Sequence, residues 1–340
     1  MKAPRFWSNP PDRPGWQSRL LAPASLLWRL GATVRRHRTR STRVDAPVLC
    51  IGNLTAGGTG KTPMVAALMD RLSARGVPAH VVSRGYGGGL NGPHLVDPLE
   101  DSANAVGDEP LLLAARGLVW VAKDRGAGAR AAADRRAPLI LLDDGFQNPG
   151  LGKDASIVMV DAGVGFGNGR VIPAGPLREP IDDGLDRADL TVLVGSAADR
   201  ARAIDQWPVL ADAIGAELSP LPTGLPLSET RVVAFAGIGR PEKFFQTLRS
   251  MGADLAEVHP FPDHHDYAPA IIRRLIARAR SIDAMLVTTE KDAVRLPSAL
   301  RAEVLTVMVR LELTDWARVD ALLDRLLPGS AAVAQGRRGR

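Results

Sequence analysis

The amino-acid sequence predicts an α/β fold in which a parallel sheet is covered by helices on both faces. Residues 47–54, 137–145, 155–163 and 188–195 are short apolar runs of strand length, and patterns of helical periodicity lie between them. Continuous apolar strands that alternate with helices are typical of a parallel sheet buried on both faces. A chain of 340 residues is also long enough for more than one core, so we expect two domains.

The composition is that of an ordinary folded protein. Apolar residues make up 45% of the chain and charged residues 24%, which excludes an intrinsically disordered protein. Cys50 is the one cysteine, so an internal disulfide is impossible and a reducing compartment is favoured. It lies in the apolar run APVLCIG, where a buried thiol is a simpler interpretation than a nucleophile.

Positive charge is concentrated at the two ends of the chain. Residues 1–44 carry ten lysine or arginine residues and a single acid, Asp12, and the tail QGRRGR adds three arginines. The stretch between these two ends is net negative. A basic terminus on an acidic body indicates an anionic partner surface, either lipid headgroups or nucleic acid.

The N-terminal segment contains no convincing membrane span or signal peptide. The run LLAPASLLWRLGATV is too short for a span, is interrupted by Arg29, and is followed by arginines rather than a cleavage site. A helix from about Ala24 would place Leu26, Leu27 and Leu30 on one side, which is typical of an amphipathic helix in a membrane surface. A helix packed on the protein's own core is the alternative.

The expected domains follow from where the strand–helix alternation stops and starts again. The first domain covers 45–207, and the pattern then fades into a stretch rich in Pro, Leu and Gly, residues 208–228, which we interpret as a linker. A second strand–loop–helix unit, beginning with RVVAFAGIGRPEKFF, predicts a smaller α/β domain over 229–328. Residues 329–340 form a basic tail that we expect to be disordered.

The sequence TAGGTGKT, at 55–62, lies between the first predicted strand and a predicted helix, which is the setting of a P-loop. Its glycines allow backbone N–H groups to surround phosphate oxygens, and the helix N-terminus adds its dipole. Lys61 would reach the terminal phosphates, and Thr62 would bind Mg²⁺. The expected nucleotide-binding residues are Thr55, Ala56, Gly57, Gly58, Thr59, Gly60, Lys61 and Thr62. A fold of the P-loop NTPase type follows.

Two positions in this loop bear on the class of protein. Thr55 stands where the general pattern has its first glycine, and a small residue with suitable backbone angles could serve there. Ala56 stands where partitioning-type ATPases have a second lysine, which argues against that class.

The motif TTEKD, at 288–292, resembles the guanine-reading motif of GTPases only loosely. A P-loop NTPase of another class, a GTPase or a nucleic-acid-binding ATPase, is the alternative function.

Three acidic or histidine-containing motifs are candidates for chemistry. Asp143 and Asp144 end an apolar strand, where P-loop proteins hold Mg²⁺, although a solvated turn would have the same sequence. The motif GDEP places Asp108 at a helix start, where an aspartate is often only an N-cap. The motif FPDHHDY contains His264, and a pair of surface histidines is the simple interpretation.

Taken in order, eight motifs closely resemble those of the tetraacyldisaccharide 4′-kinase family, over about residues 10–325. They are GNLTAGGTGKTP, SRGYGG, GDEP, LDDGFQN, GNGRVIPAGPLREP, FAGIGRPEKFF, FPDHHDY and TTEKDAVRL. The resemblance implies a P-loop kinase core, a smaller C-terminal α/β domain and an N-terminal helix on the cytoplasmic face of the inner membrane. It further implies transfer of the γ-phosphate of ATP, with Mg²⁺, to the 4′-hydroxyl of a tetraacyldisaccharide 1-phosphate, forming lipid IVA in lipid A biosynthesis.

The resemblance also implies roles for single residues. Asp108 resembles the catalytic carboxylate and His264 its partner, and no nucleic-acid partner is expected. Asn148 departs from the family pattern, which usually has histidine there, so a role for that position is in doubt. The magnesium environment would be Thr62, Glu109, Asp143 and Asp144. Apart from the resemblance, Arg84, Gln147 and Arg178 are candidate substrate contacts, with Arg178 as a candidate ligand of the substrate phosphate.

Overall fold

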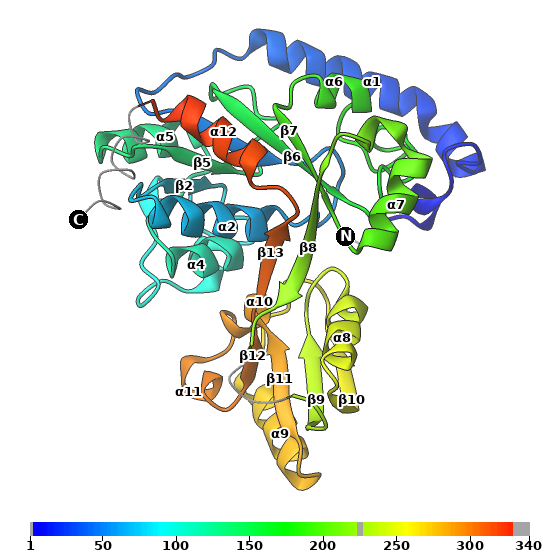
Figure 1. Ribbon diagram of the computed structural model, residues 1–340, viewed down its shortest axis with the longest axis vertical. Coiled ribbons are helices and arrows are strands. Elements are labelled where there is room, and N and C mark those ends of the chain that lie inside the picture. Colours follow the sequence, from blue (N-terminus) through cyan, green and yellow to red (C-terminus); the bar gives the residue numbers. More distant parts are fainter. Residues whose placement is uncertain (1–2, 223–226, 329–340) are drawn as a thin grey trace.

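The computed structural model describes residues 3–222 and 227–328, which form two lobes (Figure 1). Across these residues the larger lobe contains a nine-stranded sheet and the smaller lobe a four-stranded sheet. The strand order is β13-β8-β7-β6-β1-β5-β2-β4-β3 in the large sheet and β10-β9-β11-β12 in the small one. The expected disordered tail, 329–340, lies outside the described residues.

The large sheet is parallel except at its two edges, as the apolar strands predict. The strand β1 pairs in parallel with β5 and β6, whereas β13 and β3 are antiparallel to their neighbours. The strands of the larger lobe are β1 (Val48–Gly52), β2 (His80–Ser83), β3 (His94–Leu95), β4 (Val119–Val121), β5 (Ile140–Asp143), β6 (Ala155–Asp161), β7 (Leu190–Val194), β8 (Ile214–Pro220) and β13 (Val309–Leu313).

Helices cover both faces of this sheet, and each face has its own buried apolar core. The first core includes Leu68 and Leu72 of α2 on Leu49 and Ile51 of β1, and the second includes Ala129 of α5. The helices of this lobe are η1 (Arg5–Ser8), α1 (Trp16–Arg38), α2 (Lys61–Ala74), α3 (Ala103–Val106), α4 (Asp108–Ala114), α5 (Arg125–Asp134), α6 (Ile181–Leu185), α7 (Ala197–Gln206), η2 (Pro208–Leu210) and α12 (Ala317–Leu326).

The smaller lobe is a parallel sheet with helices on both sides. Its two apolar cores lie around Phe245 of α8 and around Ile272 of α9. Its elements are β9 (Arg231–Ala236), α8 (Pro241–Ser250), β10 (Asp254–Pro260), α9 (Pro269–Ser281), β11 (Met285–Thr289), α10 (Glu290–Ala293), α11 (Ser298–Arg301) and β12 (Leu305–Val307).

The stretch 208–228, which the sequence suggested as a linker, contains a strand of the large sheet. Residues Ile214, Gly215 and Ala216 of β8 pair with β7, and the rest of β8 pairs only with β13. Just the first half of the strand is therefore buried between neighbours, and its apolar pattern is incomplete. The smaller domain also ends before residue 328, the end of its expected range 229–328, because β13 and α12 return to the larger lobe. Two antiparallel strands thus connect the lobes (Figure 1).

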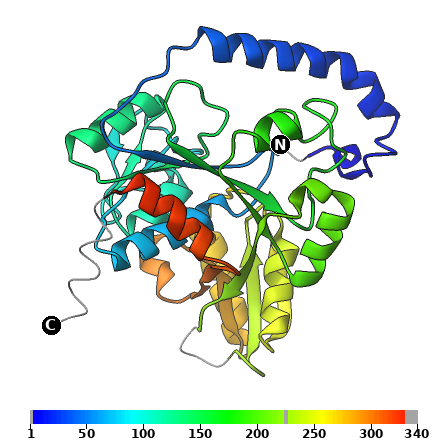
Figure 2. The ribbon, with the colours of Figure 1, turned by 45° about the horizontal axis from the view of Figure 1, so that its top comes forward.

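The helix α1 begins eight residues before the predicted start and contains Pro23. Two serines, one on each side of this proline, attach it to the larger lobe, since Ser18 Oγ donates to Ala174 O and Ser25 Oγ to Val171 O, both at 2.7 Å. The leucines of α1 do not take part in this attachment and face outward, with Leu20 71% and Leu27 70% exposed. The helix runs along the outer side of the larger lobe in both views (Figure 2). No helix of the described chain is long and apolar enough to cross a membrane.

Because α12 belongs to the core of the larger lobe, we expect Leu323→Ala to destabilise the protein. Leu323 is fully buried in the same apolar cluster as Leu68 and Leu72 of α2. Truncating a buried leucine costs about 2–5 kcal/mol of the free energy of unfolding. Urea unfolding would measure the loss, with Leu99→Ala as control because Leu99 is 94% exposed. Equal effects of the two substitutions would contradict the placement of α12 in this core.

Candidate active site

The glycine-rich loop, residues 53–60, connects β1 to α2 with the backbone geometry of a phosphate-binding loop. Gly57 and Gly60 have φ values of +142° and +86°, which side chains with a Cβ rarely adopt. A Cβ built on Gly57 or Gly58 would meet no heavy atom within 4 Å, so the loop offers open backbone to a ligand. The N-terminus of α2 follows directly and favours a bound anion.

Thr55 occupies its position without backbone strain. It is absent from the positive-φ residues of the described chain, so this position does not require glycine. Its backbone forms an antiparallel bridge with Leu177, and Ala56 N donates to Pro176 O at 2.8 Å. Asn53 Nδ2 also donates to Thr55 O at 2.8 Å. The start of the loop is therefore held in an extended form that a threonine fits.

Asp143 and Asp144 stand at the end of β5, beside this loop. Asp143 is 2% exposed, and its Oδ1 has no hydrogen-bond partner in the described structure. Burial raises the pKa of Asp143 to about 7, and the negative charge of Glu109 adds to this effect. Asp144 Oδ1 lies 3.8 Å from Lys61 Nζ and 3.0 Å from Arg178 Nη1.

A buried carboxylate oxygen without a partner fits a site for a hard cation such as Mg²⁺. The described residues contain no group of three or more His, Cys, Asp or Glu side chains that could hold a metal ion by themselves. A magnesium ion here would therefore need hydroxyl, water or phosphate ligands as well. Thr62, the second residue of α2, follows Lys61 directly and carries a hydroxyl of the kind that such a site would use.

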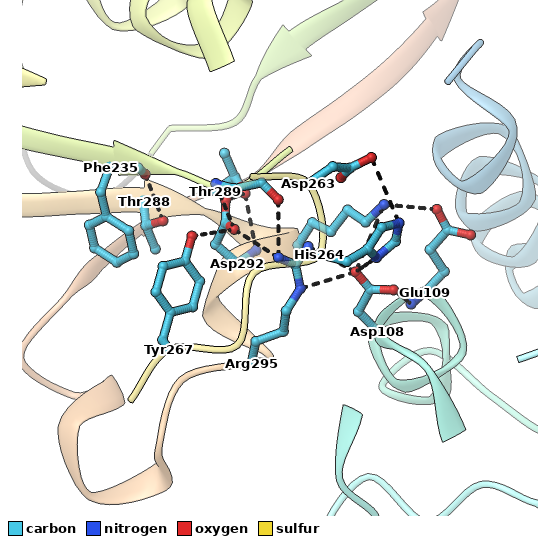
Figure 3. Close-up of polar contacts among 12 residues, drawn as sticks. Asp108, Glu109, Phe235, Asp263, His264, Tyr267, Thr288, Thr289, Asp292 and Arg295 are labelled. Atoms are coloured by element: carbon cyan, nitrogen blue, oxygen red, sulfur yellow. Dashed lines mark hydrogen bonds and ion pairs between the residues drawn. The ribbon is translucent and has the colours of Figure 1, made fainter. Parts of the chain in front are cut away.

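Asp108 and His264 meet across the two lobes (Figure 3). Asp108 is the first residue of α4 and is 3% exposed, and Nδ1 of His264 lies 3.0 Å from its Oδ2. Gly107, not Asp108, is the N-cap of α4, although Asp108 Oδ1 accepts the N–H of Glu109 at 3.0 Å. The histidine has a φ of +58° and its ring lies 5.3 Å from that of Tyr86, so it is not a free surface side chain.

Two further cations of the smaller lobe surround Asp108. Arg295 donates to Asp108 Oδ2 from Nη2 at 2.8 Å and from Nε at 3.1 Å. Lys291 Nζ lies 3.8 Å from the same oxygen and 3.1 Å from Glu109 Oε1. Burial by itself raises the pKa of a carboxyl group, but the hydrogen bond with His264 and the charges of Lys291 and Arg295 hold the pKa of Asp108 well below its ordinary value.

A cavity of about 550 Å³ adjoins Glu109 and the acids at the end of β5, and six of the predicted site residues line it, whereas Asp108, His264 and residues 55–62 of the P-loop do not. It extends from the last turn of α1, where Arg35 and Thr39 line it, to the acids at the end of β5. Asn148 also lines it, and its Oδ1 accepts the N–H of Gly150 at 2.7 Å. The predicted residues in its wall are Arg84, Glu109, Asp143, Asp144, Gln147 and Arg178.

Several residues that the structure brings to this site had no role in the predictions from sequence. Lys291 and Arg295 belong to the motif TTEKDAVRL, whose position after an apolar strand was the available signal. Arg125 lines the cavity and donates from Nη2 to Asp144 O at 2.8 Å. Nothing in the local sequence around Arg125 indicates that it would meet the end of β5, because that contact depends on the sheet order.

Comparison with known proteins agrees with this geometry. The family model of tetraacyldisaccharide-1-P 4′-kinase matches residues 17–328. Curated proteins named tetraacyldisaccharide 4′-kinase are 54% identical in Dinoroseobacter shibae and 53% identical in Jannaschia sp., covering 97% and 96% of this chain and 99% of each relative. The crystal structure of LpxK from Aquifex aeolicus in complex with ATP has a TM-score of 0.73 and 26% identity, covering 91% of this chain and 99% of that one. The chain belongs to the tetraacyldisaccharide-1-P 4′-kinase family.

Proposed function

We propose that this protein transfers the γ-phosphate of ATP to the 4′-hydroxyl of a tetraacyldisaccharide 1-phosphate, forming lipid IVA in lipid A biosynthesis. Membership of the family supports this activity, and ATP is bound in the related structure from Aquifex aeolicus. The observation that carries the proposal is the 3.0 Å contact between Asp108 and His264 across the two lobes. A buried carboxylate that is held by a histidine supports the proposal, because phosphoryl transfer from a hydroxyl uses a proton acceptor.

The P-loop would bind the phosphates of ATP through the backbone N–H groups of Gly57, Gly58 and Gly60. Lys61 would compensate the charge of the terminal phosphates, and its contact with Asp144 holds it at the end of β5. Magnesium, when bound, would supply charge neutralisation to the phosphates of ATP. The residues proposed to hold it are Thr62, Glu109, Asp143 and Asp144.

Asp108 would accept the proton of the 4′-hydroxyl. As the hydroxyl oxygen bonds to the γ-phosphorus, the bond from that phosphorus to the bridging oxygen breaks, and ADP leaves with the electron pair. The cationic neighbours keep the carboxylate ionised and thus able to accept a proton, and they also make it a weak base. His264 would orient the carboxylate, and this role requires the smaller lobe to be docked on the larger one.

The cavity beside these groups would hold the disaccharide. Arg84 and Arg178 place positive charge in its wall, which suits a substrate that carries a phosphate of its own. Gln147 donates from Nε2 to Asn53 O at 2.8 Å, while its Oε1 lies 3.3 Å from Arg178 Nη1. It can therefore align Arg178 with the start of the P-loop.

The substrate carries acyl chains, and we propose that α1 holds the protein at the lipid surface, on the cytoplasmic face of the inner membrane. The outward-facing leucines of α1 and the arginines in its last turn support this location. The same last turn lines the cavity through Arg35, so the proposed membrane face and the proposed sugar site share one helix. A nucleic-acid-binding ATPase would also use basic residues but would not need exposed leucines.

We expect Lys61→Ala to lower phosphoryl transfer by about 10²-fold or more, because loss of one preorganised charge donor commonly has that effect. Transfer of the γ-phosphate of ATP to the disaccharide 1-phosphate in detergent micelles measures it. The melting temperature should stay near that of the wild type, since Lys61 is not part of the two apolar cores of the larger lobe. Arg202→Ala, on the outer side of α7, is a control for loss of a cation. Near-normal turnover of Lys61→Ala would contradict the assigned nucleotide site.

The double substitution Leu20→Asp with Leu27→Asp should release the protein from vesicles of anionic phospholipid. Burying a leucine contributes about 1.5–3 kcal/mol, so losing two should lower the partition coefficient by roughly 10²-fold or more. Cosedimentation measures this change, and binding of ATP in solution should be unaffected. Leu99→Asp, at a leucine outside α1 that is even more exposed, is the control. Unchanged sedimentation of the double variant would show that α1 is not the lipid contact.

A further inference from the structure

Arg295 is the centre of a buried polar cluster that joins the two lobes (Figure 3). Its side chain is 6% exposed, and all three of its guanidinium nitrogens donate hydrogen bonds. Two of them reach Asp108 in the larger lobe. The third, Nη1, donates to Gly237 O at 3.0 Å and to Asp292 Oδ1 at 3.2 Å in the smaller lobe. The guanidinium group therefore bridges the proposed catalytic carboxylate and the interior of the other lobe.

Gly237, directly after β9, connects Arg295 to His264. Its carbonyl oxygen accepts from the backbone N–H of His264 at 3.2 Å as well as from Arg295 Nη1. Its own N–H donates to Asp292 Oδ1 at 3.0 Å. A Cβ at this position would lie 2.7 Å from the hydroxyl oxygen of Tyr267 and 3.0 Å from Pro262 O. Only glycine leaves room for this arrangement, so the backbone holds both partners of Asp108 in one place.

Asp292 holds the cluster rigid from the interior of the smaller lobe. It is fully buried, and its Oδ1 accepts from the hydroxyl of Tyr267 at 2.8 Å, while its Oδ2 accepts from Thr289 Oγ1 at 2.6 Å. Tyr267 is itself 2% exposed and packs edge-on against Phe235. Each buried polar atom of Asp292 thus has a partner, which is the condition under which a buried network fixes a single geometry.

We propose that Arg295 is a positioning residue of the kinase reaction. It holds the Asp108 carboxylate of the larger lobe in the position where it contacts His264 of the smaller lobe. The inference rests on the proposed function and deepens it. Donors from Arg295 and His264 both occupy Asp108 Oδ2, whereas Oδ1 accepts only from the N–H of Glu109 among the described contacts. Oδ1 is then the oxygen that accepts the proton of the substrate hydroxyl.

The role calls for a guanidinium group rather than for positive charge alone. Nε and Nη2 of the planar guanidinium group donate to Asp108, and Nη1 donates to Gly237 and Asp292. The single ammonium group of a lysine cannot span these partners with the same geometry. Arg295→Lys should therefore keep the charge but lose the register between the lobes, and Arg295→Ala should lose both.

Steady-state kinetics of the full-length protein with ATP and disaccharide 1-phosphate in micelles test this role. We expect kcat to fall by about 10²-fold in Arg295→Lys, the usual effect of a misplacement of about 1 Å, with the KM for ATP nearly unchanged. Added guanidinium ion should restore part of kcat in Arg295→Ala, because it can fill the space that the side chain leaves. Arg301→Ala, in the same lobe but bonded only to backbone carbonyls of its own loop, should show neither effect.

A double variant separates positioning from simple loss of stability. If Arg295 acts through the same carboxylate as His264, Arg295→Ala with His264→Ala should lose much less than the product of the two single losses. Near-normal kcat in Arg295→Lys and Arg295→Ala would overturn the proposal. A fall in kcat that follows the melting temperature, is not rescued by guanidinium and is fully multiplicative with His264→Ala would also overturn it. Wild-type transfer that depends on Lys61 would leave the proposed kinase function intact in either case.

Discussion

A carboxylate buried between two lobes is the interaction on which the rest of the structure depends. Removing a charge from water costs several kcal/mol unless partners compensate it, and the side chains that contact the Asp108 carboxylate in the described chain, His264, Lys291 and Arg295, all come from the smaller lobe. Asp108 itself belongs to the larger lobe, at the start of α4. These side chains reach the carboxylate only when the lobes are docked, so the proposed proton acceptor and the interdomain contact are one feature.

The topology explains how these groups meet. Parallel strands of an α/β sheet bring the loops at their carboxyl ends to one edge, where ligands bind. The P-loop after β1 and the two aspartates after β5 lie at that edge because the two strands are neighbours. A second contact lies after β6, where Asp161 pairs with Arg240 and with Lys243, the latter at 3.3 Å. The antiparallel strands β8 and β13 place the smaller lobe over this edge (Figure 1).

Much of the fold could be predicted because each local pattern had one dominant cause. Strands such as 155–161 are buried on both faces and are apolar throughout, and the glycines of the P-loop have no common structural substitute. The strand β8 could not be predicted in the same way, since its outer half pairs only with β13 and carries polar residues. The true start of α1 was missed because Pro23 normally ends a helix, and two serine hydrogen bonds to distant residues hold it here.

The residues of the candidate site also differ in how far local sequence predicts them. Asp108, His264 and the strand-end aspartates could be named from short motifs, because each motif contains the reactive group itself. Arg295 could not be given a role, since its partners Asp108 and Gly237 lie 187 and 58 residues away along the chain. The pairing of Asp108 with His264 came only from the resemblance to a family, and the local sequence of either residue suggested an N-cap and a surface histidine. Contacts between the lobes depend on tertiary structure, and local sequence patterns do not predict them.

The most direct test of this account is a double-mutant cycle on Asp108 and His264, with turnover and melting temperature measured for each variant. Asp108→Asn retains the shape of the side chain but removes its basicity, so turnover should fall by roughly 10²–10⁴-fold, the usual range for a positioned acid or base. His264→Ala should act on the same step, and the double variant should lose far less than the product of the single losses. Normal turnover in Asp108→Asn, or fully multiplicative losses in the double variant, would contradict the central claim that the two residues act as one unit across the lobes.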